Sequence, residues 1–355
     1  MKKLRLLLLL PVLTLALTAC TSYSANSWSG LTIQPNGETL YLANNTHVYA
    51  LEARSGALRW AYPEKPNPAH TFFAPPALTA DEQLILGGYD NTLYSINPAN
   101  GQPNPWSFKA ENRFIGGILT ADETIYAPVA NGHLYALNTN GQPIWQNPFR
   151  SDYPLWSKPI LSENGESLYI SGMDKHLYAL NPQDGSIQWK TDLNGSAAGT
   201  PALVENTLYQ GTFNNEVIAL NSQTGEIIWR AATSGWVWAT PAVTTDTIYV
   251  GDLNGTFYAF NRSNGEIRWQ LQPDGPIAGE ALVYEGKIYL GTESGSVYIL
   301  SSDGKIEKTL TFQGRIYAPI QQTNGLILIA PSESDTLLIA LNPDGSQAWA
   351  FTPEK

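Results

Sequence analysis

Cysteine is nearly absent from this sequence, because Cys20 is the only one in 355 residues. A single thiol forms no intrachain disulfide and builds no cysteine-based metal cluster, so we expect packing alone to stabilise the fold. Basic residues are also scarce, with 20 Lys and Arg against 31 Asp and Glu. Binding to a phosphate backbone needs clustered Lys and Arg, so this composition argues against nucleic acid as a partner.

Long hydrophobic runs are missing as well. A membrane-spanning helix needs about 20 apolar residues. The apolar run at 6–17 is shorter, is broken by Pro11 and Thr14, and follows three basic residues. A charged start before a short apolar run is typical of a secretory signal peptide. Its removal leaves 17 basic against 31 acidic residues, a net charge near -14 for the mature chain.

The only cysteine stands directly after this signal. Leu17-Thr18-Ala19-Cys20 resembles the lipobox of bacterial lipoproteins, and the alternative is an ordinary signal peptide followed by an unrelated cysteine. We predict a signal peptide over 1–19, lipidation of Cys20 and a short tether over 20–27. Two or more acyl chains would anchor the protein stably in a membrane. By this resemblance the protein is anchored in the outer membrane and faces the periplasm, and Thr21 after the cysteine is compatible with that location. In a host without an outer membrane, we expect it on the outer face of the cell membrane.

Eight copies of one unit fill the rest of the chain. Segments such as Tyr135-Ala-Leu-Asn138 recur, and their last residues are spaced 45, 41, 43, 40, 40, 40 and 41 apart. About 40 residues is the size of one four-stranded propeller blade. In the clearest copy, apolar stretches at 200–204, 207–211, 216–220 and 226–229 are separated by Asn or Gly turns. That pattern is typical of β-hairpins.

Glycine and tryptophan mark the last strand of each unit. The turn before it contains Gly56, Gly101, Gly141, Gly185, Gly225, Gly265, Gly304 and Gly345. Four residues later stand Trp60, Trp145, Trp189, Trp229, Trp269 and Trp349, whereas the second copy has Trp106 one residue later and the seventh has Lys308. Such rings each bury about 150–250 Å². We expect them to fill the outer gaps between wedge-shaped blades.

These patterns predict an all-β protein consisting of a single eight-bladed β-propeller over 28–355, with four antiparallel strands per blade. Each unit begins with an innermost strand and ends with an outermost one. We therefore expect blade-on-blade packing to close the ring, with at most a short swapped segment near Trp28.

The repeat carries a family resemblance. Residues 208–229 and 248–269 follow, with a few substitutions, the pattern Leu-Tyr-x-Gly-x-x-x-Asn-x-Val/Leu-Tyr-Ala-Leu-Asn-x-x-x-Gly-x-Ile-x-Trp, which resembles the PQQ-like propeller repeat. Eight such repeats behind a lipobox resemble the BamB-type lipoproteins of the outer-membrane β-barrel assembly machinery, over about 28–351. The resemblance implies a monomeric scaffold that binds envelope proteins and is not an enzyme.

Two other functions fit the same repeat. One is a propeller that binds an envelope polymer or a small ligand. The other is a PQQ-dependent dehydrogenase, but the family implies a longer chain for that activity and an adjacent cysteine pair that this sequence lacks. We predict no cofactor and no catalytic residue.

Histidines and carboxylates do not form a recognisable site. His47, His133 and His176 occupy the same repeat position in different blades, so they are expected to lie apart, and His70 stands in a proline-rich connection. The segment Asp252-Leu-Asn254-Gly255 has too few carboxylates for a calcium loop and predicts a hairpin turn. We predict no metal site.

The blade-to-blade connections are the candidate partner-binding surface, because function concentrates in loops on rigid scaffolds. Arg, Tyr and Trp are enriched at interface hot spots. In and beside the connections these are Arg113, Arg150, Tyr153, Trp156, Trp236, Trp238 and Arg315. We assign Trp28, Phe73, Phe114, Trp156 and Trp238 to one repeat position and favour packing between blades there. Trp236, Arg113 and Arg315 are then the stronger candidates for a partner.

Overall fold

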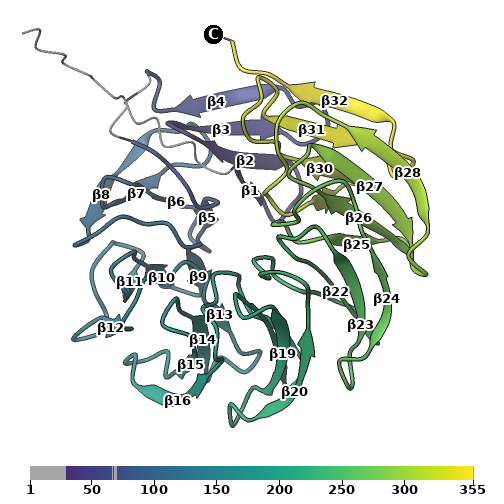
Figure 1. Cartoon of the computed structure of the whole chain (residues 1–355). Helices are drawn as coiled ribbons and strands as arrows, with labels where there is room; N and C mark the ends of the chain where they lie inside the picture. The colour runs from purple at the N-terminus through teal and green to yellow at the C-terminus, as the bar shows by residue number, and fades with distance from the viewer. Residues whose placement is uncertain (1–28, 66, 68–69, 355) are drawn as a thin grey trace, which may run out of the picture.

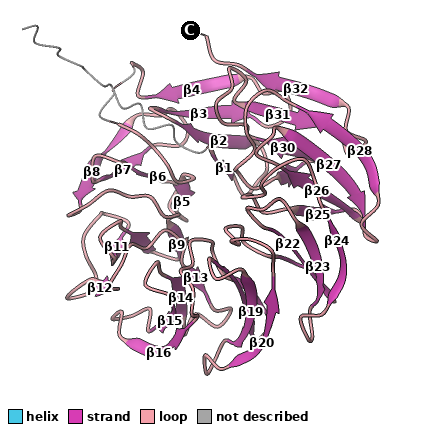
Figure 2. Cartoon of the chain, viewed as in Figure 1, coloured by secondary structure: helices cyan, strands magenta, loops and turns pink. Residues whose placement is uncertain are grey.

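The computed structural model describes residues 29–65, 67 and 70–354, and their strands form a ring of eight four-stranded sheets (Figure 1). Every regular element in this part of the chain is a strand, and no helix occurs in it (Figure 2). The sheets follow one another in chain order and are numbered here as blades 1 to 8. The predicted all-β, eight-bladed propeller is therefore confirmed, whereas the predicted signal peptide, Cys20, the tether and Trp28 lie outside the described residues.

The first half of the ring contains blades 1 to 4. Their strands are β1 (Gly30–Ile33), β2 (Thr39–Asn44), β3 (His47–Glu52), β4 (Leu58–Tyr62), β5 (Ala77–Leu78), β6 (Leu84–Gly87), β7 (Thr92–Ile96), β8 (Pro103–Lys109), β9 (Leu119–Ala121), β10 (Thr124–Pro128), β11 (His133–Asn138), β12 (Phe149–Arg150), β13 (Ile160–Leu161), β14 (Leu168–Ser171), β15 (His176–Leu180) and β16 (Ile187–Asp192).

The second half contains blades 5 to 8. Their strands are β17 (Ala202–Val204), β18 (Thr207–Thr212), β19 (Glu216–Asn221), β20 (Ile227–Ala232), β21 (Ala242–Val243), β22 (Thr247–Gly251), β23 (Phe257–Asn261), β24 (Ile267–Leu271), β25 (Leu282–Tyr284), β26 (Lys287–Gly291), β27 (Ser296–Ser301), β28 (Ile306–Thr311), β29 (Gln321–Thr323), β30 (Leu326–Ile329), β31 (Leu338–Leu341) and β32 (Gln347–Phe351).

Each blade pairs its four strands in sequence order, antiparallel throughout, so no described strand is exchanged between blades. Two kinds of loop consequently emerge on one face of the ring: the turns between second and third strands, and the connections from one blade to the next. The turns between first and second strands, and between third and fourth, emerge on the other. We call these the connection face and the turn face.

The core lies between blades rather than within them. Eight clusters of buried apolar side chains each join two neighbouring blades. Strand residues alternate between the two faces of a sheet, so each blade contributes one set of side chains to each neighbour. The cluster between blades 8 and 1, which contains Leu31 and Leu328, closes the ring.

The pairing of a turn glycine with a tryptophan, which recurs from blade to blade in this chain, has a direct structural cause. The tryptophan of one blade covers the turn glycine of the next, so that a Cβ on Gly141 would lie 2.3 Å from the Trp106 ring. The same glycine adopts a φ of 74°, which disfavours other residues. The indole of Trp145 also donates a hydrogen bond to the carbonyl of Pro182 in the next blade at 2.9 Å. The predicted role of these tryptophans between blades is confirmed.

Polar contacts reinforce the closure between blades 8 and 1. The Ser29 hydroxyl donates to the carbonyl of Pro331 at 3.1 Å, and the Gln321 amide donates to the carbonyl of Leu31 at 2.9 Å. On the outer side, a Cβ on Gly56 would lie 2.4 Å from the Trp349 ring. Packing and side-chain hydrogen bonds thus join the described ends of the ring without a swapped strand.

Candidate functional site

A backbone hydrogen bond that recurs around the ring fixes each blade-to-blade connection against the blade that follows it. In each case the first turn residue after the second strand donates its backbone N–H to a carbonyl in the connection before it. The pairs are Tyr89 to Thr71, Ala130 to Arg113, Met173 to Pro154, Phe213 to Ser196, Leu253 to Trp236, Glu293 to Pro276 and Ser332 to Arg315. Arg113, Trp236 and Arg315 are therefore equivalent positions on the connection face, belonging to the connections that enter blades 3, 6 and 8.

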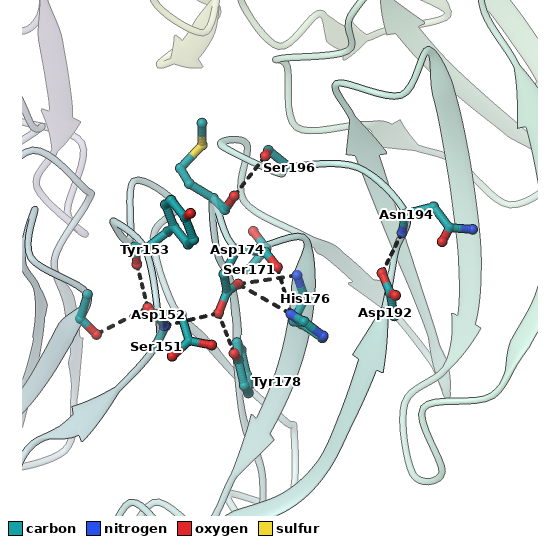
Figure 3. A network of polar contacts seen from close by, with 12 residues as sticks. Ser151, Asp152, Tyr153, Ser171, Asp174, His176, Tyr178, Asp192, Asn194 and Ser196 are labelled. Carbon is teal, nitrogen blue, oxygen red and sulfur yellow. Dashed lines mark hydrogen bonds and ion pairs between the residues drawn. The ribbon is translucent and has the colours of Figure 1, made fainter.

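The buried carboxylate of Asp174 fixes loops beneath this face (Figure 3). Asp174 accepts hydrogen bonds from the Tyr178 hydroxyl and from the backbone N–H of Asp152 and of His176. Burial, followed by the nearby Asp174 carboxylate, raises the pKa of Tyr178 well above its usual value. Tyr178 therefore remains a neutral donor, and the network holds the connection that carries Tyr153 and Trp156.

Four aromatic rings on this face form one continuous array, which we call the aromatic platform: Trp156, Trp238, Phe213 and Trp236. Trp156 and Trp238 have ring centroids 5.8 Å apart, and Trp238 lies 5.3 Å from Phe213. Phe213 stacks on Trp236 at 5.0 Å with only 12° between the planes. Trp236 is 52% exposed, so its ring packs on Phe213 with one part and is open to solvent with the rest.

The predicted repeat position of the aromatics needs one correction. Strand register places Phe114 one residue earlier than Phe73, Trp156 and Trp238, at the position of Val237, and both Phe114 and Val237 are fully buried between blades. Phe73, Trp156 and Trp238 are instead half-buried on the connection face. The packing position is thus the preceding residue, because the loop turns its next side chain outwards.

The predicted arginines lie apart from the platform. The Arg113 guanidinium lies 4.4 Å from the centre of the Tyr89 ring, which in turn packs against Phe73 at 4.9 Å. Arg315 forms ion pairs with Glu293 at 3.5 Å and Glu333 at 3.2 Å. These groups belong to different blades, so the connection face carries three separate features rather than one patch.

Arg150 and Tyr153 differ in setting from the other predicted residues. Arg150 ends the short outer strand β12, where it pairs with His133 and is exposed. Tyr153 is 62% exposed, the most of the large apolar side chains in the described chain. Of the seven predicted residues, Trp156 and Trp238 are in direct contact, and Phe213 links Trp238 to Trp236.

Sequence reasoning missed Phe213 and Tyr89, the rings that support Trp236 and Arg113. Both occupy the first turn position after the second strand, where other blades have Ala130, Met173, Leu253 or Glu293. An aromatic residue in a hairpin turn was the available signal, since turns favour Gly, Asn, Asp and Ser.

Histidines and acidic residues remain dispersed in the described chain. His133 lies 3.4 Å from Glu111, and His176 lies 3.7 Å from Asp174, in separate blades. Within the described residues, no group of three or more His, Cys, Asp and Glu is placed to hold a metal ion. Asp252, at the predicted hairpin turn, accepts backbone N–H bonds from Gly235, Asn254 and Thr256.

Comparison with known families gives one extensive match. The family described as outer membrane protein assembly factor BamB matches residues 44–171 and 173–306. Among curated proteins, Protein Rv3035 of Mycobacterium tuberculosis is 38% identical over 52 residues. That match covers 15% of this chain and only 13% of the curated relative, so it extends over little more than one repeat.

Solved structures share the architecture. BamB from Moraxella catarrhalis superposes with a TM-score of 0.71 at 18% identity, covering 89% of this chain and 93% of the other. The computationally designed protein Ika8 superposes with a TM-score of 0.72 at 11% identity, covering 92% and 96%. At such low identities these two superpositions establish the propeller fold alone. No helix in the described part of the chain has the length and apolar character to cross a membrane.

Proposed function

Because the chain belongs to the family of outer membrane protein assembly factor BamB, we propose that it is a membrane-anchored scaffold that binds envelope proteins during outer-membrane protein assembly. The polar network of the connection face supports a binding role rather than a catalytic one. Its carboxylates, such as Asp174 and Asp252, already accept several hydrogen bonds that hold loops in place. The proposed partners are components of the host's β-barrel assembly machinery.

The proposed binding surface is the connection face, with the aromatic platform at its centre. The observation that carries this proposal is the exposed Trp236 ring, which stacks on Phe213. The backbone of Trp236 is fixed as well, because its carbonyl accepts a hydrogen bond from the N–H of Leu253. A rigid aromatic ring loses little conformational entropy on binding and typically dominates interface energetics. Arg113, Arg150, Tyr153 and Arg315 lie apart from the platform and provide further proposed contacts on the same face.

Purified variants test this surface against the periplasmic part of the assembly machinery. Hot-spot truncations typically cost about 2 kcal/mol or more, so Trp236→Ala and Arg315→Ala should each raise the dissociation constant at least about tenfold. Ile306→Ala is the matched control, because Ile306 is 49% exposed but lies at the turn face. Equal binding by wild type and both connection-face variants, at unchanged melting temperature, rejects the surface.

We propose further that residues 1–19 are a signal peptide and that lipidated Cys20 anchors the propeller through a tether over 20–27. Cell fractionation tests this. Cys20→Ala should move the exported protein from the membrane pellet to the soluble fraction, with the propeller still folded. Persistence in the pellet after a high-salt wash contradicts the anchor.

A further inference from the structure

The turn face contains a cleft that the proposed scaffold role does not use. It lies between blades 5 and 6, has a volume of about 600 Å³, and is lined by residues that include Glu205, Trp229, Asp246, Arg262 and Arg268. Ligand sites typically occupy about 300–1,000 Å³. The cleft is thus large enough for a monosaccharide or disaccharide.

Arg262 is the part of this cleft that the fold fixes. Its Nε donates to the Tyr209 hydroxyl at 3.1 Å, and its Nη1 donates to the carbonyl of Thr245 at 3.0 Å. Its own carbonyl accepts the indole N–H of Trp229 at 3.2 Å. The side chain is only 14% exposed, so the guanidinium is held in place before any ligand arrives.

No other blade has a cation at this repeat position. The equivalent residues, each directly after the last residue of the third-strand segment, are Ala53, Pro98, Thr139, Pro182, Ser222, Ser302 and Pro343. Burying an arginine at a site that accepts Pro, Ser, Thr or Ala is not required by the propeller architecture. Among the eight blades, an arginine at this position is therefore particular to this cleft.

The carboxylates that form ion pairs with Arg262 and Arg268 are much more exposed to solvent than the Arg262 side chain. Glu205 pairs with Arg262 at 2.7 Å although the glutamate side chain is 78% exposed. Asp246 pairs with Arg268 at 2.7 Å and is 66% exposed. Exposed ion pairs contribute little to stability, so both carboxylates can be displaced at low cost. Each arginine would then offer a planar fork of donors suited to a carboxylate or phosphate.

A second cleft of the same kind provides an internal comparison. It lies between blades 2 and 3, with a volume of about 480 Å³, and its lining includes Asp81, Glu82 and Trp106. Its lining residues include no Lys, Arg or His. The charged residues that line this second cleft are therefore all acidic, and the arginine pair distinguishes the cleft between blades 5 and 6.

We propose that the cleft between blades 5 and 6 binds an anionic sugar, whose phosphate or carboxylate replaces Glu205 and Asp246 at Arg262 and Arg268. Trp229 and the 53%-exposed Ile228 supply the apolar wall of the cleft, against which a sugar ring packs. Glu205 and Asp246 act as internal competitors that fill the site when no ligand is bound. The proposal is independent of the connection face and of the scaffold role.

Calorimetric titration of the purified chain tests the proposal with four probes: glucose 6-phosphate, glucuronate, glucose and inorganic phosphate. We expect binding of both anionic sugars, weakened by salt because charge attraction drives it. We expect no binding of glucose and weaker binding of inorganic phosphate, which lacks a ring. Equal affinity for inorganic phosphate and the sugar phosphate, or binding of glucose, overturns the sugar assignment. No binding of any anion overturns the site.

Variants locate the binding. Arg262→Gln and Arg268→Gln should each weaken binding of the anionic sugars at least tenfold. Glu205→Gln, at an exposed side chain that tolerates change, should tighten it about two- to fivefold by removing a competitor. Arg59→Gln is the matched control, since Arg59 on β4 is the blade 1 counterpart of Arg268. Unchanged or weaker binding by Glu205→Gln overturns the competitor role.

Wild-type binding of a polymer that bears uronate or phosphate groups then separates a free sugar from an envelope polysaccharide as the natural ligand. A polymer competing with glucose 6-phosphate at equal or lower concentration per residue assigns the polysaccharide. Failure of the polymer to compete assigns the free sugar.

Discussion

The ammonium of Lys308 donates a hydrogen bond to the carbonyl of Asp344 in the next blade, at 2.9 Å. Lys308 occupies the position at which blade 6 has Trp269, whose indole donates to the carbonyl of Ser302 at 3.1 Å. The lysine therefore keeps the polar contact between neighbouring blades but not the aromatic packing. Its aliphatic stem lies against Gly345, where other blades place an indole.

This substitution separates the two contributions of the repeat tryptophan. Trp145 is 4% exposed, and replacing it with Ala should lower the free energy of unfolding by about 3–5 kcal/mol through the cavity it leaves. Lys308→Ala removes mainly one hydrogen bond and should cost about 1 kcal/mol. Urea denaturation of the two variants measures both. Similar losses would show that the indole contributes little beyond its hydrogen bond.

The overall fold was readable from the sequence because the same small unit is repeated eight times. The turn glycines and the tryptophans four residues later determine how neighbouring blades meet, as Gly185 and Trp145 show in adjacent blades. Strand order followed from the hairpin turns, and the number of blades from counting the repeats. Consistent local signals of this kind leave few alternative arrangements.

The candidate sites were less readable because they depend on residues that depart from the repeat. Phe213 supports Trp236 from a turn of another blade, and the sequence separation gives no sign of that contact. Arg262 pairs with Glu205 of the neighbouring blade, and Arg268 pairs with Asp246 of its own blade. Phe114 was misplaced by one residue because a connection can turn a side chain inwards or outwards without changing its composition.

Asp252 connects stability to the proposed binding surface. It is fully buried and accepts backbone N–H bonds from Gly235 at 2.8 Å, Asn254 at 3.0 Å and Thr256 at 2.9 Å. Asp252→Ala leaves these donors without an acceptor, so we expect a loss of about 3 kcal/mol or more in the free energy of unfolding. Because Gly235 directly precedes Trp236, partner binding should weaken as well.

The matched control is Asp184→Ala. Asp184 accepts similar bonds, from the backbone N–H of Ser186 at 2.9 Å and from its hydroxyl at 2.6 Å, but it lies in an exposed turn on the turn face. Water replaces the lost acceptor there, so the expected loss of stability is much smaller than that of Asp252→Ala, and partner binding is retained. Equal destabilisation by the two variants would contradict the assigned importance of burial.

Glu280 should make the stability of the propeller depend on pH. Glu280 stands two residues before β25, and Lys158 has the equivalent position before β13. Burial raises the pKa of Glu280 from 4.5 to about 7. The folded chain therefore retains a proton that the unfolded chain releases above its lower pKa. Stability is consequently highest below about pH 4.5 as far as this group is concerned, and it falls as the pH rises to about 7.

Replacing Glu280 with Gln removes that penalty. One pKa unit corresponds to about 1.4 kcal/mol, which sets an upper limit of about 3 kcal/mol, and partial access of water to the side chain reduces the expected gain to about 1–2 kcal/mol. Glu280→Gln should thus unfold at higher urea than wild type at pH 8 but at the same urea concentration at pH 4. Glu280→Asp, which keeps a titratable group, should follow the wild-type profile. If Glu280→Gln gains the same stability at both pH values, packing and not charge burial accounts for the effect.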